Sequence, residues 1–117
     1  MNYKIILRVD WDSNDFACTP RKVIITFTEE QIERILRYME YSTVEEVMVS
    51  MPHSNVEYVM DEDDTDLFRS DVHKIRIMGN TCYFHAQCKY DSSIQIESQP
   101  FYVSQKSKQY LIKYVYP

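Results

Sequence analysis

A single glycine, Gly79, occurs in this chain of 117 residues, where average composition would give about eight. Loops that cradle phosphates need several glycines, because their backbone N–H groups must approach the ligand closely. The tight turn that presents a nucleophilic serine needs glycines for its unusual backbone conformation. The sequence therefore excludes a P-loop, a dinucleotide-binding fingerprint and a G-x-S-x-G turn, and with them the NTPase, kinase, Rossmann and α/β-hydrolase classes.

Size and composition describe one domain. The chain is 44% hydrophobic and carries a net charge of −5, which is typical of a folded protein rather than a disordered one. Its longest apolar runs, residues 5–7 and 23–25, are far shorter than the ~18 residues of a membrane helix. Lys4 and Arg8 interrupt the apolar region that a signal peptide would need. We expect one compact cytoplasmic domain over residues 1–117, without a membrane segment.

Apolar periodicity predicts the elements and their order. Residues 44–51 have a helix-cap signal at their start and apolar residues at helical spacing, although their valines would also suit a strand. The order of elements predicts an α+β fold, with a mainly antiparallel sheet and one longer and one short helix packed on one face. The predicted strands are residues 3–9, 22–27, 55–60, 94–97, 101–103 (separated from the preceding strand by Pro100) and 109–116, with a hairpin that turns at 79–80, and the predicted helices are 29–41 and 44–51.

Two local signals define boundaries. Thr28 and Gln31 have the spacing of a capping box, in which each side chain accepts a backbone N–H of the other residue at a helix start. Gly79–Asn80 suits a two-residue hairpin turn. The register that follows separates an apolar face from a polar one, and a slip of one residue would mix the two. The predicted pairs are Met78–Thr81, Ile77–Cys82, Arg76–Tyr83, Ile75–Phe84 and Lys74–His85.

Negative charge is concentrated in residues 57–71, which have a net charge of −6, while the rest of the chain has a net charge of +1. A concentrated charge of one sign steers and selects partners of the opposite sign, so we predict that this acidic segment docks a protein with a basic surface. Partial resemblance to a calcium loop does not continue at the positions that need Gly and Glu, and a solvated acidic loop is the simpler interpretation. The predicted partner-binding carboxylates are Glu57, Asp61, Glu62, Asp63, Asp64 and Asp66.

The last predicted strand supplies a second candidate surface. Tyr110, Tyr114 and Tyr116 lie on one of its faces, and Tyr is favoured at recognition surfaces. The strand is apolar on both faces, so it is either central in the sheet or an edge that a partner chain or a homodimer would cover.

The polar face of the hairpin is a third candidate surface. Cations interleaved with aromatic rings on a sheet can hold single-stranded nucleic acid through phosphate contacts and stacking, although an ordinary solvent-facing sheet has the same pattern. The residues of this alternative nucleic-acid face are Lys74, Arg76, Tyr83, His85 and Lys89.

Catalytic and metal chemistry finds little support in the sequence. Cys82, His85 and Cys88 are evenly spaced, but strand alternation places His85 on the opposite face from the two cysteines, so they cannot converge on one zinc ion. Cys18 with His53 or His73 has no third group to complete a nucleophilic site. We therefore predict a non-catalytic protein-binding module or small inhibitor without cofactor or metal. The alternatives are single-stranded nucleic-acid binding and a small metal-assisted enzyme.

Overall fold

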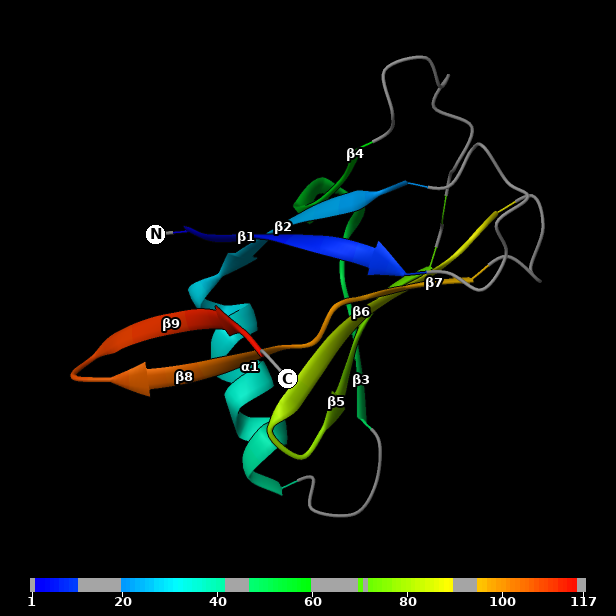
Figure 1. The fold of residues 1–117 in the computed structure, drawn as a ribbon. Helices are drawn as coiled ribbons and strands as arrows, with labels where there is room; N and C mark the ends of the chain where they lie inside the picture. Colours follow the sequence, from blue (N-terminus) through cyan, green and yellow to red (C-terminus); the bar gives the residue numbers. More distant parts are fainter. Residues whose placement is uncertain are drawn as a thin grey trace.

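The computed structural model describes residues 2–10, 20–41, 47–59, 70, 72–89 and 95–115 (Figure 1). Within these ranges, nine antiparallel strands form one sheet in the order β3-β5-β6-β7-β1-β2-β4, and β8 and β9 branch from β6. The elements are β1 (Asn2–Asp10), β2 (Lys22–Thr28), α1 (Glu29–Tyr41), β3 (Val47–Ser50), the short 3-10 helix η1 (His53–Asn55), β4 (Val56–Val59), β5 (Val72–Met78), β6 (Thr81–Gln87), β7 (Gln95–Ser98), β8 (Phe101–Lys106) and β9 (Gln109–Tyr114).

The predicted two-helix α+β packing is wrong. The sheet curls into a half-barrel (Figure 1), and α1 is the single α-helix of the part of the chain that the structure describes. The predicted second helix at 44–51 contains strand β3 instead, in which Val47 pairs with Ile77 and Val49 with Ile75. Val49 is buried in this pairing. Residues 42–46 lie outside the described residues. Pairing with β5 therefore decides the conformation of a segment whose valines suit either structure.

The predicted first helix is confirmed, with its cap. The Thr28 N–H donates to Gln31 Oε1 at 2.9 Å, and the Gln31 N–H donates to Thr28 Oγ1 at 3.2 Å. Asn55 Nδ2 also donates to Gln31 Oε1 at 3.0 Å and to the Thr26 carbonyl at 2.7 Å. The cap thus ties α1, β2 and η1 together. Ile32 and Ile35 are fully buried, and the helix packs against β2, β5 and β8.

The predicted hairpin register is confirmed at all five pairs between β5 and β6. Gly79 has a φ of 60°, which glycine adopts without the steric penalty of a Cβ atom. The buried apolar side chains of these strands, Ile75, Ile77, Cys82, Phe84 and Ala86, lie on one face of the hairpin. There they join one core whose largest fully buried side chains are Phe27, Phe84, Phe101, Leu7, Ile25, Ile32, Ile35, Ile75, Ile77, Ile96 and Val23.

The predicted break at Pro100 is confirmed, and at this point the chain changes its strand partners. β7 pairs with β1, whereas β8 pairs with β9. The Gln99 N–H donates to the Arg8 carbonyl and the Arg8 N–H donates to Gln99 Oε1, both at 2.8 Å. The Val115 N–H donates to the Pro100 carbonyl at 3.1 Å. The buried Ser98 hydroxyl accepts the Phe84 N–H at 2.8 Å. Side-chain and backbone groups thus replace the regular ladder at the bend.

The partner change leaves β1 and β9 side by side without a ladder between them, an arrangement that we call the β1–β9 fork. The Tyr114 hydroxyl donates to the Ile6 carbonyl at 2.6 Å. The rings of Tyr3 and Tyr110 meet edge to face, with centroids 5.7 Å apart. Tyrosine side chains therefore connect the two strands where backbone hydrogen bonds do not.

Candidate functional site

The outer, convex face of the sheet brings together four residues that the sequence predicted to share a face. Lys74 lies opposite His85, and Arg76 lies opposite Tyr83. All four are partly exposed, because alternate residues of β5 and β6 point away from the core. Lys89, the fifth predicted residue, is exposed just beyond the end of β6.

Arg76 is held between two neighbours on this face. Its Cζ atom lies 4.9 Å from the centroid of the Tyr83 ring, which is a cation–π contact. Its Nη2 atom lies 2.8 Å from Glu97 Oε1 in an ion pair whose side chains are 26% and 37% exposed. Glu97 partly neutralises the cation, and the guanidinium covers one face of the aromatic ring. Both effects suit contact with a protein better than contact with phosphates and stacked bases.

Two exposed methionines adjoin Arg76. Met48 of β3 lies directly opposite Arg76 in the ladder and is 45% exposed, while Met78, two residues further along β5, is 50% exposed. Met, Tyr and Arg are the side chains enriched in the buried centres of protein interfaces. We call Met48, Arg76, Met78, Tyr83 and Glu97 the convex patch.

The sequence missed Met48 because it assigned this residue to a helix. The alternation of β-branched Val47 and Val49 around Met48 was the signal that could have placed it on the outer face of a strand. β3 pairs only with β5 among the described strands, so the convex patch reaches one edge of the sheet.

Most of the acidic segment lies outside the described residues, including Asp61, Glu62, Asp63, Asp64 and Asp66. Glu57 is exposed on β4, opposite Ile24. The structure therefore places one of the six predicted carboxylates, and it lies at the surface.

A buried polar network lies where the described chain enters and leaves this segment. The Tyr58 hydroxyl and His73 Nδ1 form a hydrogen bond of 2.7 Å, and the Ser70 side chain also hydrogen-bonds that of Tyr58. His73 occupies the predicted core position opposite Ala86 and is 4% exposed. Burial raises the pKa of Tyr58 above its ordinary value. The network joins β4 to β5.

The predicted tyrosines of the last strand face the fold. The Tyr110 hydroxyl donates to Glu33 Oε1 at 2.6 Å, and the Tyr114 hydroxyl is bonded within the β1–β9 fork. The hydrogen bond to Glu33 raises the pKa of Tyr110 to about 12. Tyr116 lies outside the described residues. The sequence left open whether this strand is central in the sheet or an edge. In the described ranges β9 is an edge strand, because it pairs only with β8.

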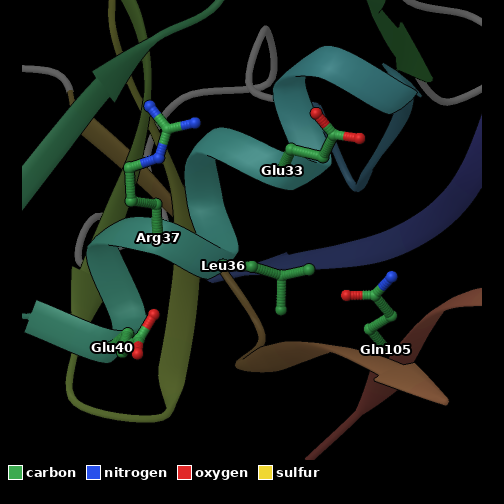
Figure 2. A pocket seen from close by; sticks show the side chains of 5 residues that line it. All are labelled: Glu33, Leu36, Arg37, Glu40 and Gln105. Atoms are coloured by element: carbon green, nitrogen blue, oxygen red, sulfur yellow. The ribbon is translucent and has the colours of Figure 1, made fainter.

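A shallow groove of about 290 Å³ separates α1 from β8. Leu36 of the helix and Gln105 of β8 extend into the space between the two elements (Figure 2). The carboxylate of Glu33, at one side of the groove, already accepts the Tyr110 hydroxyl. The remaining charged residues of the wall, Arg37 and Glu40, have opposite signs and lie on the same helix as Glu33.

The two thiols that the structure describes belong to the core. Cys82 is fully buried, and its Sγ atom lies 3.9 Å from Met39 Sδ. Burial raises the pKa of the Cys82 thiol to about 12, which makes the reactive thiolate scarce at neutral pH. Cys88 is also buried, whereas His85 lies on the convex face, as alternation predicted. Among the described side chains, no group of three or more His, Cys, Asp or Glu residues is placed to hold a metal ion. Cys18 and the His53 side chain lie outside the described residues.

Comparison of the chain with protein-family models, with curated proteins and with solved structures finds no match. Within the described ranges, no helix combines the length and the apolar character needed to cross a membrane.

Proposed function

We propose that this chain is a non-catalytic protein-binding module that contacts its partner through the convex patch. The observation that supports the proposal is the position of two exposed methionines, Met48 and Met78, beside the stacked Arg76 and Tyr83. These residues combine an apolar centre with a fixed cation on one continuous face, which is the composition of a recognition surface.

The arrangement reduces the side-chain entropy that this protein loses when it binds a partner. The contacts of Arg76 with Tyr83 and Glu97 hold a long side chain in one conformation, so little rotamer entropy is left to lose. The methionines, with flexible and polarizable side chains, adapt to the shape of the partner. A rigid centre with adaptable neighbours favours a specific protein contact over a purely electrostatic one.

The acidic segment is the second contact in this proposal. Its net charge of −6 over residues 57–71 favours a partner that carries a basic surface and accelerates the encounter. The exposure of Glu57 is compatible with this role. The convex patch would then supply short-range contacts, and the acidic segment long-range attraction.

The convex patch is tested by affinity capture from the source cell, followed by titration of the captured protein against purified variants. We expect the Met48→Ser/Met78→Ser double variant to bind about tenfold more weakly, because two central apolar contacts are lost. Ile6→Ser/Tyr38→Ser is the matched control, since both side chains are exposed but lie on β1 and α1. Equal affinity of the patch variant and the wild type, with equal thermal stability, would refute the role of the convex patch.

The acidic segment is tested by replacing Asp61, Asp63, Asp64 and Asp66 with Lys. We expect binding to be abolished and the circular dichroism spectrum to be retained. Unchanged affinity would remove the segment from the proposal. The absorbance ratio of the captured material at 260 and 280 nm tests the alternative, single-stranded nucleic-acid binding. A nucleic-acid-rich eluate whose binding weakens steeply with salt would favour the alternative nucleic-acid face, which consists of Lys74, Arg76, Tyr83, His85 and Lys89.

A further inference from the structure

The hairpin of β8 and β9 leaves the main sheet. β8 pairs with β6 at one position, Cys82 with Phe101, and from Tyr102 onward its ladder is with β9 alone among the described strands. Figure 1 shows the hairpin extending beyond the edge of β6 and in front of α1. Its base is anchored by buried Phe101 and Val103, while its tip, residues 105–109, is exposed throughout.

The two faces of the hairpin differ in what they contact. One face points into the fold, with Tyr110 bonded to Glu33 and Tyr114 bonded to Ile6. The other face, which we call the outer hairpin face, is built from the cross-strand pairs that alternate with these residues. It carries Tyr102, Ser104, Lys106, Gln109, Leu111 and Lys113.

The outer hairpin face has partly exposed Leu111 at its centre, partly exposed Tyr102 beside Lys113 at its base, and exposed lysines, Lys113 and Lys106, at its two ends. Tyr102 lies opposite Lys113, and Leu111 lies opposite Ser104. An apolar centre with a polar, charged rim is the usual anatomy of a protein interface. Glu97 is the last Asp or Glu of the sequence, so the side chains of residues 98–117 have a net charge of +3, whereas the sequence as a whole has a net charge of −5.

The tip is strained in a way that fixes its shape. Ser107 and Lys108 both have positive φ angles, 53° and 68°, in a two-residue turn where Asn-Gly would be the usual choice. Non-glycine residues in this region cluster at functional positions. The turn therefore places Lys108 at the end of the hairpin, at a position where glycine would be more stable.

We propose that the outer hairpin face is a docking surface for an acidic protein surface, separate from the convex patch. Charge complementarity selects the partner, and Tyr102 and the central Leu111 make the short-range contact. A protein is favoured over nucleic acid because Tyr102 is the one aromatic residue among the cross-strand pairs of this face, whereas strand binding relies on successive stacked bases.

The test is fluorescence anisotropy at low salt with a labelled peptide of alternating glutamate and leucine. Unlabelled polyglutamate and oligothymidylate serve as competitors. We expect Lys106→Gln/Lys113→Gln to weaken peptide binding about fivefold or more, through loss of two charges at the rim of the surface. The matched control, Lys4→Gln/Lys22→Gln, removes the same charge from exposed positions on β1 and β2 and should change affinity by less than about twofold.

A second variant examines the centre of the surface. Leu111→Ser should weaken binding of the leucine-containing peptide and leave polyglutamate binding unchanged. Equal losses in the two lysine pairs, or no peptide binding, would contradict the proposal, and competition by oligothymidylate as effective as that by the peptide would replace it with phosphate recognition. Met48→Ser/Met78→Ser should bind the peptide as the wild type does, so failure of the convex patch and failure of this surface are distinguishable.

Discussion

At the scale of single residues, tyrosine hydroxyls fasten together elements that are distant in the sequence. Tyr58 joins β4 to β5, Tyr110 joins β9 to α1, and Tyr114 joins β9 to β1. Each hydroxyl reaches a position where the backbone ladder is interrupted or absent. The tyrosines of this chain therefore stabilise the curled sheet as well as contributing apolar area.

Tyr114→Phe tests this role directly. The substitution removes the hydrogen bond to the Ile6 carbonyl and keeps the ring, so we expect the free energy of unfolding in urea to fall by about 1 kcal/mol. Tyr102→Phe is the control, because its hydroxyl makes no hydrogen bond to a described residue. Equal effects of the two substitutions would show that the hydrogen bond in the β1–β9 fork contributes nothing.

Two buried groups predict a loss of stability at alkaline pH. Burial raises the pKa of Cys82 from 9.0 to about 12 and also raises that of Tyr58 above 10.0. Because each folded-state pKa exceeds the unfolded one, the protonated groups contribute their full stability below pH 9 and lose it as the pH rises toward 12. Urea unfolding between pH 8 and 11 should show this decline.

Cys82→Ala separates the two contributions. We expect the variant to be less stable at pH 8, because a buried side chain is shortened, and to lose less stability than the wild type between pH 9 and pH 11, because one titrating group is absent. A pH dependence identical to that of the wild type would show that Cys82 ionises normally.

At the scale of elements, the two hairpin turns differ in the residue types that adopt a positive φ angle. The β5–β6 turn uses Gly79 at 60°, while the β8–β9 turn uses Ser107 and Lys108. Ser107→Asn/Lys108→Gly should therefore stabilise the protein by about 1 kcal/mol, measured by urea unfolding.

Gly79→Ala is the matched substitution in the other turn. A Cβ atom at this position meets nothing within 4 Å, so its cost is conformational alone, about 1 kcal/mol of destabilisation. A destabilised Asn-Gly variant would mean that the β8–β9 turn is held by contacts of Ser107 or Lys108 rather than strained.

The elements that could be predicted are those with local signals. The capping box of Thr28 and Gln31, the turn at Gly79 and the break at Pro100 each act within a few residues, and all three are confirmed. β3 was missed because its stability comes from pairing with β5, 24 to 30 residues away in the chain. Periodicity alone does not report such non-local pairing.

The candidate surfaces were also predictable only where they depend on local signals. The register of β5 and β6 placed Lys74, Arg76, Tyr83 and His85 on one face correctly. The sequence could not show that Glu97 pairs with Arg76, or that Met48 adjoins it, because these contacts depend on the order of strands in the sheet. For the same reason, it could not show which face of β9 turns toward α1.

At the scale of the whole molecule, the sheet forms a half-barrel in which the chain changes its strand partners between β7 and β8. Arg8 bonds to Gln99 through both its N–H and its carbonyl, so the N–H groups of Lys4 and Ile6, four and two residues earlier, point into the β1–β9 fork by strand periodicity. The N–H groups of Ile5 and Leu7 point toward β2, with which they are paired. The two sets of amides therefore differ in environment along one strand.

Hydrogen exchange followed by NMR should resolve this difference. We expect the amides of Lys4 and Ile6 to exchange at least about tenfold faster than those of Ile5 and Leu7, because the former have no ladder partner among the described strands. Uniform protection along β1 would show that the fork closes in solution into a continuous sheet.

The bend at Gln99–Pro100 also bears on how the chain folds as it leaves the ribosome. Strand β1 is synthesised before the other described strands, yet its contacts with Gln99 and Tyr114 lie 91 and 108 residues later in the chain. The nascent protein must therefore carry an incompletely paired strand β1 until β8 and β9 have been made, and contacts of this range form slowly. During that interval the exposed edge is open to pairing with other nascent chains, so translation speed and chaperone access would govern the yield of folded protein.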